Sequence, residues 1–384
     1  MTNVWLSRAM DIKEELYKIR EDLHRNPELG NEEYRTTEYI DKYLKGLGIE
    51  TVKVLETGLI GRLRFNGEGK TVGLRADIDA LPVKENTGAS FASINEGIMH
   101  ACGHDTHMTA ALGAAKILSE HKDELSGQAV FIFEPDEEGS GGARRMIAKG
   151  VLDGVDAVFG MHVTPDLPAG EVGIKYGKFY AASDMFDIFV KGKTAHGATP
   201  EKGIDALQAA AKVAIRLHDI PSNYSDRCIL TIGTLNAGTK ENTVAGDAKL
   251  TGIIRTLGPE MRRDVKAKLK EVCQDVSKET GTEIEVVLKE SYGGIVNTDA
   301  ETEFAKAAAM KVIGPDKVHI LEEPNMTTED FGYFVEECGG AFYHIGAGCD
   351  KALHSDEFLP QKEMLPAAAA FHAGIIAGFL NGDL

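Results

Sequence analysis

The sequence predicts an α/β protein in which a smaller domain is inserted into a discontinuous layered domain. Three observations support this architecture. The chain has 384 residues, more than one hydrophobic core usually organises. Short apolar strands alternate with helices towards both ends of the chain. The middle has the order β-α-β-β-α-β of a ferredoxin-like fold. We expect residues 1–178 and 293–384 to form the main domain and residues 179–292 the insertion.

The N-terminal part of the chain is expected to begin with helices and continue with strands. Ile12, Leu16 and Ile19 recur at helical spacing, and Asn26-Pro27 ends this helix. The elements expected after it are a helix over 31–47, a strand over 72–77, a helix over 105–119 with Asp105 as its N-cap, a strand over 129–133, a helix over 142–149 and a strand over 157–160. Short apolar strands between helices indicate a buried and largely parallel sheet.

The middle of the chain supplies the inserted domain. Its expected elements are strands over 184–190, 229–235, 248–256 and 283–288, and helices over 204–217 and 259–278. The main domain resumes with a helix over 301–312 and a strand over 341–345. We expect the Ala-rich run over 366–380 to form a packed helix, because His372 interrupts it and a membrane span needs roughly 18 or more apolar residues.

Composition excludes several classes of partner. The formal net charge of −18 disfavours nucleic acid and anionic membrane surfaces. The five cysteines are scattered and odd in number, which fits free thiols in a reducing compartment better than a disulfide framework. The first residues run directly into charged helical sequence and lack the pattern of a signal peptide. We therefore expect a soluble cytoplasmic protein.

The segment around Cys102 and His104 carries the first indication of a metal site. A thiolate and an imidazole suit zinc and neighbouring transition metals. Their i, i+2 spacing directs both side chains to one side in extended backbone, just before the expected helix. For this pair alone, a buried cysteine beside an exposed histidine is the more common explanation.

Further candidate ligands lie at or beyond the ends of expected strands. These residues are Asp77, Glu134, Asp136, Glu137, Glu138, His162 and His354. Each by itself is more often part of a solvated loop or a structural histidine. Together they matter, because ligands of open α/β sheets bind at the carboxyl ends of strands. Crowded carboxylates raise one another's pKa values, and a cation relieves that cost. The pattern predicts one rim with enough donors for two metal ions.

The adjacent glutamates Glu137 and Glu138 can have different roles. Their side chains diverge in an extended or turn backbone, so one can bind metal while the other stays free. The free carboxylate can then take a proton from an attacking water whose pKa the metal lowers. Such an arrangement suits the hydrolysis of an unactivated amide.

The ordered set of motifs resembles the dinuclear aminoacylase and carboxypeptidase family. The most similar branch is that of hippurate, N-acetylamino-acid and auxin-conjugate hydrolases, and the match spans nearly the whole chain. The motifs are LHRNPELG (23–30), LRADIDALP (74–82), MHACGHD (99–105), EEG (137–139), GMH (160–162), GKTAH (192–196), GIIR (252–255) and LHS (353–355). As an ordered set these motifs are highly specific.

The resemblance implies a role for each matching residue. The implied ligands of two divalent metal ions per subunit (Zn, Mn, Co or Ni) are Cys102, His104, Glu138, His162 and His354. Glu137 would be the catalytic base, and Asp77 would support the metal site from behind the ligands. The insertion would be a lid and dimerisation domain of a homodimer or dimer-based oligomer. His196 would reach a neighbouring active site and polarise the scissile carbonyl. Asn242 and Arg255 would hold the substrate's carbonyl or carboxylate.

Four positions need separate comment. His107 lies one helical turn from His104 but is not a ligand in the family, so we expect it to line the pocket or the first helical turn. Asp136 stands where the family branch usually has a small residue, and we expect an effect on metal preference or on hydrogen bonds around the site. Ala245 replaces a proline after Asn242, and the loop over 327–328 replaces a glycine- or serine-rich loop; both bear on substrate specificity.

The expected activity is hydrolysis of N-acetyl or N-aroyl amino acids, which are linear amides other than peptides. N-Acetyldiaminopimelate, N-acetylcysteine and hippurate-like compounds all remain open as substrates. A dipeptidase or carboxypeptidase with the same metals is the first alternative. A metal-stabilised binding protein without turnover is the second, and Glu137 argues against it, because a purely structural site needs no free base.

Overall fold

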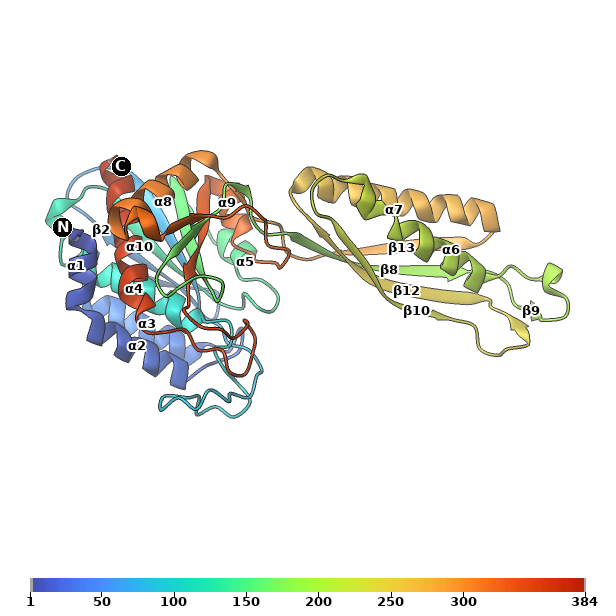
Figure 1. Cartoon of the computed structure of the whole chain (residues 1–384), viewed down its shortest axis with the longest axis horizontal. Helices are drawn as coiled ribbons and strands as arrows, with labels where there is room; N and C mark the ends of the chain where they lie inside the picture. Colours follow the sequence, from blue (N-terminus) through green and yellow to red (C-terminus); the bar gives the residue numbers. More distant parts are fainter. Residues whose placement is uncertain (1–2, 383–384) are drawn as a thin grey trace. The chain divides into compact units, whose positions relative to one another are not determined.

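The computed structural model describes residues 3–382, and the chain divides into two compact units (Figure 1). The first unit contains the described residues up to Gly177, together with Asn297–Glu323 and the chain from Asp330 onward. The second contains Lys178–Val296 and Pro324–Glu329. Both are mixed α/β units, as the sequence predicts.

The first unit is built on an eight-stranded sheet with the order β1-β2-β4-β3-β5-β16-β6-β15. Its strands are β1 (Glu50–Val54), β2 (Gly58–Arg64), β3 (Thr71–Asp77), β4 (Gln128–Glu134), β5 (Ala157–Thr164), β6 (Val172–Ile174), β15 (Val318–Ile320) and β16 (Gly340–Gly346). Its helices are α1 (Val4–Asp11), α2 (Lys13–Arg25), α3 (Tyr34–Gly46), α4 (His104–Ser119), α5 (Ala143–Ile147), α8 (Asp299–Val312), α9 (Gly332–Cys338) and α10 (Met364–Asn381).

The centre of this sheet is parallel and its margins are not. Strands β4, β3, β5 and β16 run in one direction, whereas β1, β2 and β6 pair with antiparallel neighbours. Every residue of β5 and β16 is buried, as expected for strands covered on both faces. Since parallel strands end at the same edge, the carboxyl ends of β3, β4 and β5 bring their last residues together.

Three local expectations for this unit need correction. Helix α4 begins at His104 after Gly103, so Asp105 is inside the helix and is not its N-cap. The Asp105 carboxylate instead accepts from Arg20 Nε at 2.8 Å. Strand β5 extends to Thr164, so His162 lies within the strand and not beyond it. Gly103 has φ 85°, so Cys102 and His104 flank a left-handed turn rather than extended backbone.

Helix α10 is long and apolar enough to cross a membrane by length and composition, but most of it is buried inside the first unit. It packs against α1, α4 and α8. This burial agrees with the expected packed helix and explains its Ala-rich sequence, because small side chains let helices approach closely.

The second unit has the predicted order β-α-β-β-α-β. Its main elements are β8 (Ala182–Lys191), α6 (Ala206–His218), β10 (Ile229–Ala237), β12 (Asp247–Thr256), α7 (Pro259–Thr280) and β13 (Glu283–Glu290), with the short strands β9 (Ala195–His196) and β11 (Thr243–Val244) at one end. The sheet order is β10-β12-β8-β13, and all its pairs are antiparallel. Helices α6 and α7 lie on one face of the sheet (Figure 1), where Phe186, Ile188 and Val190 form its core with them.

The segment Pro324–Glu329 belongs to the second unit although it is distant in sequence. Asn325 donates its N–H to the Phe179 carbonyl at 2.7 Å, and its own carbonyl accepts from Ala181 N at 3.0 Å. The sequence-based boundaries at 178/179 and 292/293 do not include this return of the chain, because a short extended segment has no periodicity of its own.

A glycine at the contact of three helices gives a test of this packing. A Cβ at Gly113 of α4 would lie 2.7 Å from Leu16 Cδ2 and 2.8 Å from the Cβ of Ala369 in α10. We predict that Gly113→Ala lowers the free energy of unfolding by about 1–3 kcal/mol through overpacking. Thermal and urea denaturation of the wild-type protein and of Gly113→Ala would measure this loss of stability.

Gly46 at the end of α3 is the matched control, since nothing lies within 4 Å of the position of its Cβ. Gly46→Ala should be neutral or slightly stabilising. Equal destabilisation by both substitutions would contradict the packing argument.

Candidate metal centre

The turn before α4 places the first two predicted donors. Cys102 is buried, and His104 is the first residue of the helix. The intervening Gly103 tolerates no side chain, because a Cβ there would lie 2.5 Å from Val163 Cγ1. Glycine is therefore required both for the left-handed backbone and for the close approach of β5, which carries His162.

The structure brings the five predicted ligands together. Cys102 Sγ lies 3.2 Å from His162 Nε2 and 3.3 Å from His354 Nε2. Glu138 Oε1 lies 3.1 Å from His354 Nε2 and 4.0 Å from His104 Nε2. Ligands about 2.0–2.3 Å from a tetrahedral metal ion are roughly 3.3–3.8 Å from one another, so these spacings suit metal binding.

These donors form two groups that share one atom. Cys102, His104 and His162 form the first group, and Cys102, Glu138 and His354 form the second; within each group the donor atoms lie within 4.8 Å of one another. A thiolate common to both groups is the arrangement expected for a sulfur that bridges two ions. The first group is fully buried, whereas His354 is exposed and has φ 65°.

Hydrogen bonds orient two of the imidazoles. His162 Nδ1 is 2.7 Å from the Val163 carbonyl, and His104 Nδ1 is 2.9 Å from the Asp79 carbonyl. A carbonyl can only accept, so Nδ1 of each ring carries a proton, and in the neutral ring that binds a metal ion each Nε2 presents a lone pair. His104 Nε2 is buried and has no hydrogen-bond partner among residues 3–382. A metal ion would satisfy it.

The donors carry surplus negative charge. Burial, Glu138 and Glu137 raise the pKa of the Cys102 thiol well above its ordinary value. Burial alone would lower the pKa of His104, but Asp77 and Asp79 outweigh it and raise that pKa to about 10. A proton on His104 and a bound cation would compensate the same negative charge. The sulfur, nitrogen and carboxylate donors therefore fit the two divalent ions that the sequence implies.

Glu137 lies beside this donor set. It is buried, and a carboxylate oxygen of Glu137 lies within 4.8 Å of the donor atoms of His104 and Glu138. The two adjacent glutamates follow β4 in a turn, as expected from the sequence. Glu137 is thus close enough to the candidate metal positions to serve the water that they would activate, and its role as base remains a prediction.

Asp77, at the end of β3, is fully buried behind His104. Its Oδ2 accepts from Arg75 Nη1 at 2.7 Å and lies 3.6 Å from His104 Nε2. Burial alone would raise the pKa of Asp77, but Arg75, His104 and His107 hold it well below its usual range. The residue is therefore an anion beside the donors, as its predicted supporting role requires.

Asp79 is a residue that the sequence analysis did not single out. Its Oδ1 lies 3.1 Å from His104 Nδ1, and its Oδ2 accepts from the Glu138 N–H at 2.9 Å. One carboxylate thus ties together a ligand on α4 and a ligand beyond β4. A signal was present, because Asp79 lies two residues after Asp77 at the end of the same strand.

Asp136 does not join the metal donors. Its Oδ2 accepts from Ser140 N at 3.2 Å and from Arg145 Nη2 at 3.0 Å. Its carboxylate also occupies the space where side chains at Gly30 or Gly139 would lie. Asp136 has φ 60° and therefore shapes the turn that presents the next two glutamates. The expected effect on hydrogen bonds concerns this turn and not the ligands.

The remaining candidate residues, His196, Asn242 and Arg255, lie in the second unit. Arg255 is at the opposite end of its sheet from the other two. His196 of β9 pairs with Thr243 of β11, and Asn242 directly precedes β11, where its carbonyl accepts from Gly197 N at 2.7 Å. His196 Nδ1 accepts from Ala198 N at 3.0 Å, so the neutral ring carries its proton on Nε2. Arg255 pairs with Ser183 at the other end of β12.

Arg255 is half-buried, and its Nη1 has no hydrogen-bond partner within the described part of the chain. A guanidinium with a buried, unsatisfied donor is suited to an anionic ligand. Near Asn242, Ala245 is buried, and its carbonyl accepts from Ala206 N at 3.0 Å. This bond fixes the turn that a proline stabilises in the family branch. Thr327 hydrogen-bonds to Ala181 through its carbonyl, so the loop over 327–328 is part of the second unit.

Known proteins match most of the length of this chain. The model of the peptidase family M20/M25/M40 matches residues 73–377. An N-acetyl-L-cysteine deacetylase of Bacillus subtilis is 37% identical over 365 residues, covering 94% of this chain and 87% of the relative. Thermostable carboxypeptidase 1 of Saccharolobus solfataricus is 35% identical over 384 residues, covering 97% of each chain.

A solved structure extends the likeness to the whole fold. The YXEP protein of Bacillus subtilis, described as a dinuclear metal binding peptidase, has a TM-score of 0.87 and 32% sequence identity. The match covers 97% of this chain and 99% of that one. The family resemblance inferred from the motifs and the α/β fold class predicted from the order of strands and helices are confirmed.

Metal removal should destabilise the protein. A cation that binds the folded donors but not the unfolded chain adds about 2.7 kcal/mol of stability at a concentration 100 times its dissociation constant. We therefore expect chelator-treated protein to melt at a lower temperature than protein supplied with Zn²⁺, Mn²⁺ or Co²⁺. Differential scanning calorimetry with metal analysis would measure the difference.

His354→Ala should reduce this stabilisation, because it removes a donor. His319→Ala is the matched control, since His319 pairs with Glu171 outside the donor set. Identical melting of the wild-type protein with and without metal would refute the site.

Proposed function

Because the chain belongs to the peptidase family M20/M25/M40, we propose that it is a metal-dependent amidohydrolase that cleaves the amide bond of N-acyl amino acids. The observation that carries the proposal is the convergence of five donors with an adjacent, buried Glu137. A purely structural metal site needs the donors but not a second carboxylate beside them.

The proposed site holds two divalent ions per subunit. Their ligands would be Cys102, His104, Glu138, His162 and His354. When bound, such ions polarise the scissile carbonyl and lower the pKa of water towards neutrality. The mixed thiolate, imidazole and carboxylate set is compatible with Zn, Co, Ni or Mn.

The protein side chains supply the proton transfers and the binding. Glu137 would take a proton from the attacking water and later deliver it to the leaving amine. Glu137 is adjacent to Glu138 in the chain, so the base is held at a fixed position relative to a ligand. His196, with its proton on Nε2, can donate to the carbonyl oxygen as negative charge develops there. The products would be a carboxylic acid and a free amino acid.

Arg255 would bind the α-carboxylate of the substrate, on the part that is released as the free amino acid. Its unsatisfied Nη1 supports this assignment. A free α-carboxylate is common to N-acyl amino acids and to substrates of carboxypeptidases, so Arg255 does not distinguish them. The likeness to a carboxypeptidase of Saccharolobus solfataricus keeps that activity as a second candidate. A panel of N-acetyl and N-benzoyl amino acids, tested beside dipeptides, would separate the two.

His196 and Arg255 lie too far apart in one chain to hold the same small substrate. Arg255 lies eight positions after Asp247 along β12, which at about 3.3 Å per residue is roughly 26 Å. His196 lies beyond the Asp247 end, in the ribbon formed by β9 and β11. We infer that His196 and Asn242 serve the site of a neighbouring subunit, and that the second unit is a lid and dimerisation domain.

Strand β10 offers a surface for this dimer. It is an edge strand of nine residues without a charged side chain, whereas half of the eight residues of the opposite edge, β13, are charged. Charges on an edge strand discourage pairing with another strand, so the uncharged edge is the one open to it. Two copies of β10 related by a twofold axis would pair antiparallel and join the sheets.

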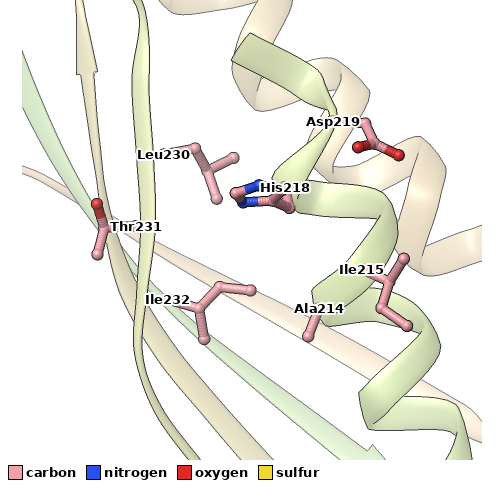
Figure 2. Close-up of a pocket in the computed structure, with 7 residues that line it drawn as sticks. All are labelled: Ala214, Ile215, His218, Asp219, Leu230, Thr231 and Ile232. Atoms are coloured by element: carbon pink, nitrogen blue, oxygen red, sulfur yellow. The ribbon is translucent and has the colours of Figure 1, made fainter. Parts of the chain in front are cut away.

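Exposed apolar side chains on β10 and on the neighbouring α6 belong to the same surface. Leu235 of β10 is 41% exposed, and Ile215 of α6 is 68% exposed. Between α6 and β10 lies a groove of about 600 Å³. Figure 2 shows Leu230 and Ile232 of β10 pointing towards α6, Leu230 towards His218 and Ile232 towards Ala214. An apolar side chain from a partner subunit would fill this groove.

We predict that Glu137→Gln retains the metal ions but lowers turnover by about 10²–10⁴-fold, because an amide cannot accept the proton. Steady-state assays with N-acetyl amino acids and metal analysis would test this. The matched control is Glu138→Gln, which replaces a carboxylate ligand by a neutral amide and should lower the metal content as well. Turnover of Glu137→Gln close to that of the wild type would refute the mechanism.

We also predict that Leu235→Lys yields a monomer that keeps its metals but loses turnover, because it places a charge on the uncharged edge and withholds the partner's His196. Analytical ultracentrifugation and activity measurements would test this. Glu285→Lys on β13 is the control and should leave the assembly unchanged.

Mixing inactive subunits tests the shared site directly. Dimers formed from His196→Ala and Glu137→Ala chains should regain part of the activity, since one of their two sites would be intact. Verified mixed dimers without any recovery would show that His196 does not act across subunits.

A further inference from the structure

His107 lies between two of the proposed ligands and uses both of its ring nitrogens. It is buried in α4, one turn after His104. Its Nδ1 is 2.6 Å from Asp77 Oδ1, and its Nε2 is 2.9 Å from the backbone nitrogen of Val163. A backbone N–H can only donate, so Nε2 accepts and the ring proton is on Nδ1, donated to Asp77.

This hydrogen bonding excludes His107 as a ligand. Its ring is neutral, and no lone pair is left for a metal ion. The potential donor group formed by Asp77, His104 and His107 is therefore not a third metal position. Yet the His107 ring lies 5.3 Å from the ring of His104 and 4.8 Å from that of His162, so it contacts both proposed imidazole ligands.

Val163 connects His107 to His162 through two hydrogen bonds. Its N–H is held by His107, and its carbonyl accepts from His162 Nδ1 at 2.7 Å. The orientation of the His162 ring, whose Nε2 faces Cys102 Sγ at 3.2 Å, thus depends on the position of this backbone segment.

The other end of the chain of hydrogen bonds is anchored in the core. Asp77 accepts from Arg75 Nη1 at 2.7 Å, and Arg75 Nε donates to Glu134 Oε2 at 2.6 Å. All three side chains are buried, so loss of one partner would leave an uncompensated charge in a region of low dielectric constant. The resulting network runs from β4 and β3 through His107 of α4 to β5.

We propose that His107 is a positioning residue that fixes the orientation of His162 through Val163, and thereby sets the affinity of the metal position formed by Cys102, His104 and His162. This inference rests on the proposed ligand set. The position formed by Cys102, Glu138 and His354 shares Cys102 with the first but contains neither of the imidazoles that His107 contacts, so it serves as an internal reference.

The test compares two substitutions of different chemistry. His107→Gln provides one donor and one acceptor, whereas His107→Phe retains bulk without hydrogen bonds. Zn²⁺ and Co²⁺ titrations would give the two dissociation constants, and the absorption spectrum of the Co²⁺ protein would report the geometry of its ligands. Met108→Leu is the control, because Met108 is a buried neighbour in α4 outside the network.

We expect His107→Phe to weaken binding at one position by roughly 10–100-fold and to change the Co²⁺ spectrum. The second dissociation constant should stay as in the wild type. His107→Gln should restore most of the affinity, which a role in core packing alone would not produce. If His107→Phe does not fold, His107→Asn takes its place, since its amide is too short to span both partners.

Unchanged dissociation constants in the variant without the hydrogen bonds, or equal weakening of both positions, would overturn the proposal. These measurements do not depend on turnover. A protein that shows the selective loss of affinity but hydrolyses no amide would retain the role of His107 and refute the proposed function.

Discussion

The concentration of buried negative charge at the ends of the central strands is the constraint on which the first unit depends. Asp77, Asp79 and Glu137 are almost without exposure to solvent, and Cys102 can join them as a thiolate only if a cation compensates it. Arg75 offsets part of this charge from within the core by binding Asp77. The negative charge that Arg75 does not offset faces the candidate metal positions. Metal affinity and folding stability are therefore coupled in this unit, because the same charges govern both.

The sheet topology places these side chains close together. Parallel β3, β4 and β5 end at the same edge, and the left-handed turn at Gly103 brings α4 to that edge as well. The oriented lone pairs of His104 and His162 depend on hydrogen bonds to backbone carbonyls. Rigid elements thus hold the donors at spacings that suit metal binding, whereas His354 reaches the site from an exposed loop. The two positions differ in burial, so they should also differ in how readily they exchange metal.

The second unit poses a different constraint, which is distance. A small substrate spans only a few ångströms, but Arg255 and His196 lie at opposite ends of an extended strand system. A single chain cannot apply both residues to one substrate. In the proposed dimer, the uncharged edge of β10 would pair with a second copy, and the charged edge of β13 would restrict pairing to one side. Oligomerisation would then be part of the catalytic arrangement and not only a source of stability.

The sequence by itself determined the α/β class and the inserted β-α-β-β-α-β unit, because hydrophobic periodicity is a local property, and its ordered motifs predicted the metal donors. It could not place Asp79 between His104 and Glu138, or direct Asp136 away from the metal, since hydrogen bonds between distant residues are absent from local pattern. The family resemblance alone excluded His107 as a ligand, since a histidine one turn from a ligand has the same spacing in either role. The tertiary structure gives the physical reason, because Asp77 and the Val163 N–H already occupy both of its ring nitrogens.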